Sequence, residues 1–198
     1  IMTHPGIELI GQNVEQAVTC GNVHADAIIK LADTFDNIAL TMIMDLSLEA
    51  EAFGAKINFA TNDVPSVIEP LLKDFTDIDN LEIPNLTNGR IPEYIKANAI
   101  VLEHLQQSKP LFSSCIGPYS LACRLFGMTE LMMAQFTDPV KVHTLIAKCT
   151  TFIIKYCKAL KDIGSNGVII AEPVAGLLSP DDCDNFSSRY VQRIVSEL

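Results

Sequence analysis

The chain has 198 residues, of which 48% are apolar, and this composition excludes a disordered protein. Its net charge is −10, from 14 basic and 24 acidic residues. The basic residues form no cluster that could neutralise phosphates, so we expect no nucleic-acid partner. No stretch reaches the roughly 20 uncharged apolar residues of a membrane span, and residues 1–6 (IMTHPG) do not resemble a signal peptide. We therefore expect a cytoplasmic protein that acts on a small molecule or docks on another protein.

Strand-like segments alternate with longer helical segments along the chain. The first residues, IMTHPG, are typical of the end of a strand. Further strands are predicted at residues 38–44 (IALTMIM), 111–116 (LFSSCI) and 167–171 (GVIIA). None of these segments alternates cleanly between apolar and polar residues, which indicates a sheet covered on both faces.

Helices are predicted between these strands. Two of them span residues 24–35 and 92–106, and a third begins at Pro118. Asp138 and Pro139 provide an N-cap and a first helical residue for a long helix that Gly164 ends, and Ser179 with Pro180 begins the last one. Residues 54–91 show a looser pattern and are interpreted as an excursion with a short strand (56–60), a brief helix and a loop.

Alternating strands and helices predict a parallel sheet with right-handed crossovers. The chain has no G-x-G-x-x-G and no G-x-x-x-x-G-K-[ST], so a closed (β/α)₈ TIM barrel is favoured over an open dinucleotide-binding sheet. Only about four of the eight strands are present, and a whole barrel needs about 250 residues. We expect residues 1–198 to be a single domain, the N-terminal half of one barrel, in a protein that begins before Ile1 and continues beyond Leu198.

In TIM barrels the chemistry lies at the carboxyl ends of the strands. The residues at the predicted strand ends are the candidate site residues, and they are His4, Asp45, Gly117, Pro118, Tyr119 and Glu172. Glu49 lies one helical turn beyond Asp45 on the same face and is added to the candidates.

Each candidate also has a purely structural interpretation. Asp45 could be the N-cap of the following helix, and Glu49 could be a solvated or structural carboxylate. Glu172 could cap a neighbouring helix or pair with an arginine. His4 could be a surface residue, and Tyr119 could pack its ring under the rim of the barrel.

The cysteines show no pattern of a metal site or a disulfide framework. There is no C-x-x-C, and no histidine lies two residues from a cysteine. Most are expected to be buried reduced thiols, and their positions are 20, 115, 123, 149, 157 and 183.

Three segments in the same order resemble the uroporphyrinogen decarboxylase superfamily. They are IMDLSLEAEAFGAKINF (43–59), KPLFSSCIGPYSLACRLFG (109–127) and GSNGVIIAEPVAGLLSPDDC (164–183). The superfamily is a (β/α)₈ barrel. Its two main branches are the porphyrinogen decarboxylases and the cobalamin-dependent methyltransferases, such as methylcobalamin:coenzyme M methyltransferase.

The resemblance favours the methyltransferase branch. The decarboxylases carry an R-Q-A-G-R signature at the end of the first strand, whereas this chain has MTHPGIEL and no arginine before Arg90. Their substrate-binding tyrosine corresponds to Arg124 here, and only their F-S-D-like aspartate has a match, Asp45. A substrate with many carboxylates needs several arginines, so the loss of two of three hallmarks argues against porphyrinogen decarboxylation.

The resemblance therefore implies a corrinoid-dependent methyltransferase of one-carbon metabolism that moves a methyl group between a corrinoid and a small thiol or folate acceptor. Asp45 and Glu172 would orient the acceptor or its metal, with Glu49, His4 and residues 117–119 shaping the pocket. Zinc is implied as a cofactor, with its ligands expected outside this chain. The expected partners are a corrinoid protein and the acceptor, and a homodimer stays open. The alternatives are a decarboxylase of the same superfamily and a non-catalytic barrel that binds a corrinoid or tetrapyrrole.

Overall fold

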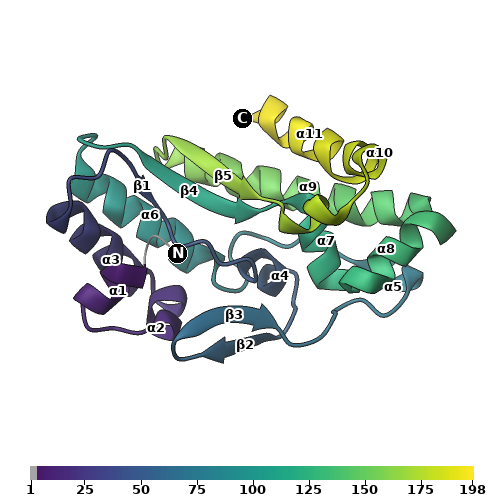
Figure 1. Ribbon diagram of the computed structural model, residues 1–198, viewed down its shortest axis with the longest axis horizontal. Coiled ribbons are helices and arrows are strands. Elements are labelled where there is room, and N and C mark those ends of the chain that lie inside the picture. The colour runs from purple at the N-terminus through teal and green to yellow at the C-terminus, as the bar shows by residue number, and fades with distance from the viewer. Residues whose placement is uncertain (1–3) are drawn as a thin grey trace.

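A computed structural model describes residues 4–198 of the chain (Figure 1). Its centre is a three-stranded parallel sheet in the order β1-β4-β5. The strands are β1 (Leu40–Thr41), β4 (Leu111–Ile116) and β5 (Gly167–Ala171). Strands β4 and β5 pair over five residues, from Phe112 opposite Gly167 to Ile116 opposite Ala171. Their carboxyl ends therefore lie side by side at one edge of the sheet.

Helices pack along the sheet and form its rim. The larger ones are α3 (Gly21–Thr34), α6 (Ile91–Leu105), α7 (Pro118–Phe126), α8 (Met128–Thr137), α9 (Pro139–Asp162) and α11 (Arg189–Glu197). The shorter ones are α1 (His4–Leu9), α2 (Val14–Thr19), α4 (Leu48–Ala52), α5 (Phe75–Asn80), the 3₁₀ turn η1 (Pro173–Leu177), α10 (Pro180–Cys183) and the π-helical turn η2 (Asp184–Ser188). Helices α6 and α9 cover one face of the sheet, because Ser113 of β4 bonds Asn98 of α6 and Cys115 of β4 contacts Cys157 of α9 (Figure 1).

Several sequence predictions are confirmed. Strands β4 and β5 have the predicted bounds, and helix α9 begins after Asp138, whose side chain accepts a hydrogen bond from the Lys141 N–H at 3.2 Å. Ser179 caps α10 in the same way, through the Asp182 N–H. These elements were predictable because their caps and their apolar periodicity agree.

The predicted first strand is wrong where the structure can test it. Residues 1–3 lie outside the described residues, but His4, Pro5 and Gly6 begin helix α1 instead of ending a strand. Gly6 packs against the backbone of Ala27 in α3, where a Cβ would overlap the carbonyl oxygen. This close approach to a segment 21 residues further along the chain is not visible in a local pattern of residues.

Strand β1 is shorter than the predicted segment 38–44. Beyond Met42 the backbone leaves β4, and side chains replace the hydrogen bonds of the sheet. The Ile43 N–H donates to His24 Nε2 at 3.0 Å, and the Ser114 hydroxyl donates to the Ile43 carbonyl at 3.1 Å. The sheet is thus open between β1 and β4 on the side where both strands end.

The excursion at residues 54–91 contains an antiparallel hairpin below the sheet (Figure 1). The predicted strand corresponds to β2 (Ile57–Ala60), and the brief helix to α5. Its partner strand β3 (Asp63–Val67) was missed, because Pro65 argues against a strand and is tolerated only at an edge.

All six cysteines are free, and Cys115, Cys123, Cys149 and Cys157 are buried as predicted, while Cys20 and Cys183 are half-buried. Cys149 and Cys157 lie on the buried face of α9 with Phe152 and Ile153. They are part of the largest apolar cluster, which joins α4, α7 and α9.

Lys148 of α9 holds the end of α5. Its ammonium group donates to three backbone carbonyls, those of Ile78, Asp79 and Leu81, at 2.7, 2.9 and 2.7 Å. These carbonyls lie at the carboxyl end of α5, where the last turn of a helix lacks intrahelical partners and carries partial negative charge.

We expect Lys148→Met to lower the free energy of unfolding by about 2 kcal/mol, because three half-buried carbonyls lose a charged donor. Urea unfolding measures this change. Lys155→Met, on an exposed face of the same helix, is the matched control and should change stability by less than about 0.5 kcal/mol. Equal stability of the two variants would contradict a capping role for Lys148.

Candidate functional site

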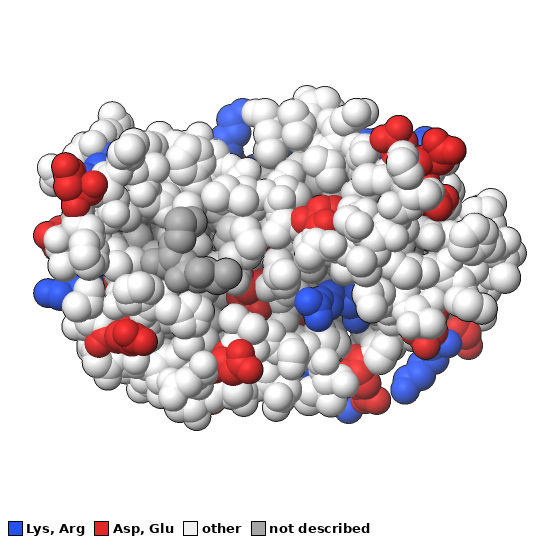
Figure 2. All heavy atoms as spheres, in the orientation of Figure 1, with Lys and Arg blue, Asp and Glu red and all other residues white. Residues whose placement is uncertain are grey.

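A cavity of about 430 Å³ opens where β1 leaves the sheet. Its wall comes from α1, α2, the end of β1, the β2–β3 hairpin, α7 and the inner face of the sheet, and it is largely apolar. The lining residues that carry polar side chains are His4, Thr41, Asp45, Ser114 and Arg124. Figure 2 shows this side of the molecule, with blue Lys or Arg atoms visible near the middle of the face.

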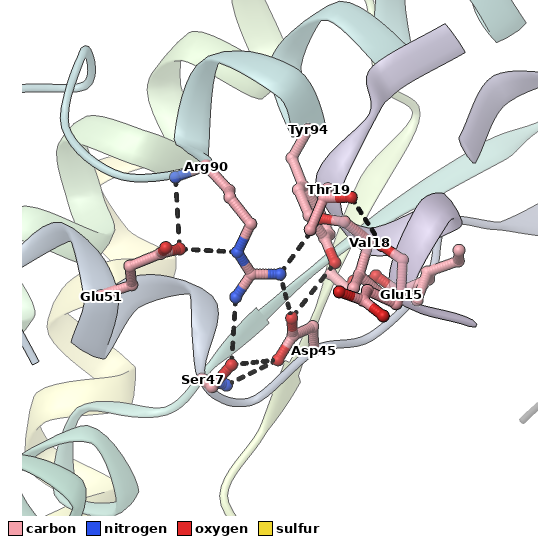
Figure 3. Close-up of polar contacts among 10 residues, drawn as sticks. Glu15, Val18, Thr19, Asp45, Ser47, Glu51, Arg90 and Tyr94 are labelled. Carbon is pink, nitrogen blue, oxygen red and sulfur yellow. Dashed lines mark hydrogen bonds and ion pairs between the residues drawn. The ribbon is translucent and has the colours of Figure 1, made fainter. Parts of the chain in front are cut away.

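Below the cavity wall, Arg90 is enclosed by polar partners (Figure 3). Its Nη1 lies 2.6 Å from Asp45 Oδ2, its Nε lies 2.6 Å from Glu51 Oε2, and its Nη2 donates to the Ser47 hydroxyl at 3.1 Å. The Val18 carbonyl of α2 accepts a further bond at 3.1 Å. One guanidinium therefore ties together the end of β1, helix α4, the start of α6 and helix α2.

This cluster is buried, and its charges compensate each other. The side chains of Asp45 and Arg90 are 1% and 8% exposed. Burial alone would lower the pKa of Arg90, but Asp45 and Glu51 outweigh it and raise the pKa above its ordinary value. The Phe59 ring packs 4.8 Å from the guanidinium carbon and covers the ion pair. Arg90 is therefore permanently charged and fully engaged within the protein.

Asp45 lines the cavity, but its carboxylate points into the cluster. Oδ1 accepts bonds from the Ser47 N–H and hydroxyl at 2.9 and 2.7 Å, and Oδ2 accepts from Arg90 and, at 3.4 Å, from the Tyr94 hydroxyl. Ser47, not Asp45, occupies the N-cap position of α4. The carboxylate accordingly supports the cavity wall from behind.

Glu49 is buried, which contradicts its interpretation as a solvated carboxylate. It is 1% exposed, and its Oε1 accepts a bond from the Ile116 N–H at 3.0 Å. Oε2 has no hydrogen-bond partner among the described residues. Burial raises the pKa of Glu49 to about 8, with a further contribution from Asp45, so the side chain is a neutral acid at pH 7. The bond from the Ile116 N–H to Glu49 takes the place, at the end of β4, of the backbone hydrogen bond that β1 no longer provides.

Glu172 follows β5, and its carboxylate caps helix α7. Its two oxygens accept bonds from the Tyr119 and Ser120 N–H groups at 3.0 and 2.5 Å. Burial raises its pKa, and these N–H bonds partly oppose the shift. A Cβ at Gly117 would overlap this carboxylate, so a larger residue there would displace the Glu172 side chain. Glu172 thus joins the ends of β4 and β5, and it does not line the cavity.

Tyr119 lies in the core between α7 and α8. Its ring is fully buried, and its hydroxyl accepts a bond from Gln135 Nε2 at 3.0 Å. Burial raises the pKa of this hydroxyl. Pro118 is the first residue of α7 and is buried beside Tyr119.

The candidate residues thus form two groups. His4 and Asp45 lie at the cavity, whereas Gly117, Pro118, Tyr119 and Glu172 form the joint between β4, α7 and β5, with Glu49 behind them. Sequence reasoning missed the cluster around Arg90 and the position of Arg124 in the cavity wall. The Asn88-Gly89 turn, with Gly89 at φ +54°, was a local signal for a helix start at Arg90, but nothing local indicated its acidic partners.

Residues 4–198 contain no group of three or more His, Cys, Asp or Glu side chains that could hold a metal ion. Burial also raises the pKa of Cys123 to about 12 and raises the pKa of Cys149 well above its ordinary value, so these thiols are protonated. Metal-binding cysteines are thiolates, so the described residues do not fit a zinc site by themselves.

Within the same residues, no helix is long and apolar enough to cross a membrane.

We expect Arg90→Met to lower the free energy of unfolding by about 3–5 kcal/mol, because it leaves the buried Asp45 carboxylate without its positive partner. Urea unfolding measures the loss. The double variant Asp45→Asn/Arg90→Met should recover part of it, and the exposed Arg193→Met is the control with little effect. A loss below about 1 kcal/mol in Arg90→Met would show that the cluster does not hold these elements together.

Glu49 should make stability depend on pH. Its folded pKa of about 8 exceeds the ordinary value of 4.5, so the unfolded chain loses the proton first as the pH rises. The free energy of unfolding therefore falls between these two values, by up to about 1.4 kcal/mol per pH unit. Glu49→Gln, which stays neutral, should lack this contribution.

The measurement is urea unfolding of the wild type and Glu49→Gln from pH 5 to 8. Burial lowers the pKa of His24 to about 3, so His24 makes the free energy of unfolding rise with pH, opposite to Glu49. This contribution is the same in both proteins and cancels when the Glu49→Gln values are subtracted from those of the wild type. Glu103→Gln, on the exposed side of α6, should keep the slope of the wild type. Parallel curves for wild type and Glu49→Gln would contradict a neutral Glu49.

Comparisons with known proteins agree with this architecture. The profile of the uroporphyrinogen decarboxylase (URO-D) family matches residues 3–198. Methylcobamide:CoM methyltransferase MtbA from Methanosarcina mazei is 31% identical over 93% of this chain, and its counterpart from Methanosarcina acetivorans is 29% identical over the same share. Uroporphyrinogen decarboxylase from Psychromonas ingrahamii is 28% identical over 83% of the chain.

The chain spans 58% of the length of the two methyltransferases and 48% of that of the decarboxylase. A solved structure of a methyltransferase from Methanosarcina mazei superposes with a TM-score of 0.91 over 98% of this chain and 58% of that chain, at 24% identity. This likeness confirms the expected fold, the N-terminal portion of an α/β barrel of the URO-D type. The chain belongs to the uroporphyrinogen decarboxylase family.

Proposed function

We propose that the chain is part of a corrinoid-dependent methyltransferase that moves a methyl group between a corrinoid and a small thiol or folate acceptor. The observation that carries the proposal is the lining of the cavity, which is largely apolar and contains one arginine, Arg124, among the described residues. The names of the relatives from Methanosarcina, methylcobamide:CoM methyltransferase, support the same reaction class and suggest a methylated corrinoid protein and coenzyme M as partners.

The decarboxylase alternative has support from the relatives that are named uroporphyrinogen decarboxylase. Charge argues against it. A porphyrinogen carries many carboxylates and needs several arginines to hold them. Arg90 is the nearest other candidate, but it is 8% exposed and engaged by Asp45 and Glu51. The described cavity thus offers a polyanion too little positive charge. A non-catalytic corrinoid-binding barrel is the remaining alternative.

In the transfer to a thiol, the sulfur atom of the thiolate forms a bond to the methyl carbon while the cobalt–carbon bond breaks. The electron pair of the broken bond stays on cobalt. The apolar wall of the cavity suits this reaction, because it excludes water from the nucleophile. Zinc, which the family resemblance implies, would lower the pKa of the acceptor's thiol when bound. The described residues do not form its site.

The residues of this chain would position the reactants. His4 lines the cavity and takes no part in the buried cluster, so it would contact the acceptor. Asp45 would hold the cavity wall through Arg90, and Glu49 would fix the end of β4. Glu172 would fix the Gly117–Tyr119 turn against β5, as a positioning residue.

The test uses the full-length protein with methylcobalamin and either coenzyme M or tetrahydrofolate. We expect methylcobalamin absorbance to be lost with formation of the methylated acceptor, which mass spectrometry identifies. Uroporphyrinogen in place of both substrates should release no CO₂. Decarboxylation of uroporphyrinogen would overturn the proposal. Spectral changes on cobalamin binding without transfer to any acceptor would establish the binding alternative instead.

A further inference from the structure

The sequence contains two Asn-Gly pairs, and the structure holds them in different ways. An asparagine before a glycine loses its side-chain amide most readily, because the glycine backbone turns freely and no side chain shields its N–H. One pair is Asn88-Gly89, directly before Arg90, and the other is Asn166-Gly167 at the start of β5. The two dipeptides are identical, so a difference in their reactivity comes from the fold.

Asn88 lies in an exposed turn. Its N–H donates to the Asn85 carbonyl at 3.1 Å, and Gly89 has a φ of +54°. Its side-chain amide makes one long hydrogen bond, from Nδ2 to the Ala52 carbonyl at 3.4 Å. The Gly89 N–H donates no hydrogen bond within residues 4–198. Asn88 also lines a hollow of about 470 Å³ between α4 and α5, so water reaches its side chain.

Asn166, in contrast, is fixed to the first residue of β4. Its N–H donates to the Leu111 carbonyl at 3.0 Å, and its Oδ1 accepts from the Leu111 N–H at 2.9 Å. Gly167 pairs with Phe112, whose ring lies 2.9 Å from the position that a Cβ on Gly167 would occupy. The Asn166 amide carbon can approach the Gly167 nitrogen only if the bond to β4 breaks. The fold therefore opposes at Asn166 a reaction that it leaves open at Asn88.

We infer that Asn88 is a site of spontaneous deamidation, with water as the co-reactant, and that this modification loosens the ion cluster around Arg90. The backbone nitrogen of Gly89 loses its proton and forms a bond to Asn88 Cγ. The bond from Cγ to Nδ2 breaks, and the nitrogen leaves with the proton as ammonia. Water then opens the cyclic imide at one of its two carbonyls, which gives aspartate or isoaspartate. The reaction does not depend on the proposed methyl transfer.

Both products place a carboxylate where the structure has a hydrogen-bond donor. A carboxylate at position 88 cannot donate to the Ala52 carbonyl, and it adds negative charge near Glu51, whose Oε2 lies 3.3 Å from the position of a Cβ on Gly89. Isoaspartate also adds one atom to the backbone, two residues before Arg90. Glu51 accepts from the Arg90 N–H at 3.3 Å and from its Nε at 2.6 Å (Figure 3), so a shift of this turn acts directly on the ion pair.

The first experiment compares the two asparagines within the folded full-length protein. The protein is incubated at mildly alkaline pH, and tandem mass spectrometry of its peptides follows the gain of one dalton at each position. Asn88 should react at least about tenfold faster than Asn166, because Asn166 must first give up its hydrogen bond to β4. In concentrated urea the two rates should become similar. Equal rates in the folded protein, or no reaction there at Asn88, would overturn the inference.

The second experiment tests the effect on the cluster. Ion exchange separates the modified protein, which carries one more negative charge, and urea unfolding should show a lower midpoint for it than for the unmodified protein. Asn88→Gln is the matched control, because its longer side chain forms a cyclic imide much more slowly. Incubation should change neither its charge at position 88 nor its midpoint. An unchanged midpoint of the separated isoaspartate form would overturn the link to the cluster.

A double-mutant comparison asks whether the effect acts through Glu51. Asn88→Asp reproduces the charge of one product without the reaction, and it should lower the urea midpoint of the wild type. In the Glu51→Gln background the same substitution should lower the midpoint less, because the neighbouring charge is gone. An equal decrease in both backgrounds would contradict an effect on the Glu51–Arg90 pair.

Discussion

The buried ion cluster around Arg90 is the constraint on which this site depends. Its guanidinium, at the start of α6, compensates Asp45 after β1 and Glu51 of α4, and it also binds the Val18 carbonyl of α2. A buried carboxylate without a partner is strongly unfavourable, so these segments hold together or separate together. The direction of α4 follows from this cluster, and with it the place of Glu49 beneath the end of β4.

The cavity exists because the sheet opens between β1 and β4. Parallel strands normally continue their hydrogen bonds to their ends, but here three side chains take over. His24 and Ser114 bind the Ile43 backbone, and Glu49 binds the Ile116 N–H. These three bonds give the Ile43 N–H, the Ile43 carbonyl and the Ile116 N–H a side-chain partner, while Glu49 Oε2 and His24 Nδ1 have none among the described residues. The chain can then line a space with side chains where a continuous sheet would be closed.

A charged side chain at the end of a strand or helix can either bind other parts of the protein or face the cavity, and in this structure different residues have these two roles. Glu172 and Asp45 both lie at strand ends, yet their oxygens point to backbone N–H groups and to Arg90. Both side chains hold neighbouring segments of the chain together. Arg124, on the last turn of helix α7, is a charged side chain that lines the space inside. Position in the fold therefore indicates where a site lies, while hydrogen-bond partners decide which residues face a ligand.

The sequence by itself determined the parallel strands β4 and β5, the capped helices α9 and α10, and the buried cysteines, because local periodicity and caps specify them. Asp45, Glu49 and Glu172 could be placed near strand ends for the same reason. Only the tertiary structure decided where their carboxylates point, because their partners Arg90, Ile116 and Tyr119 lie 45, 67 and 53 residues away in the chain. The early end of β1, the helical start at His4 and the place of Arg124 in the cavity wall likewise depend on contacts between distant segments, which no local pattern of residues encodes.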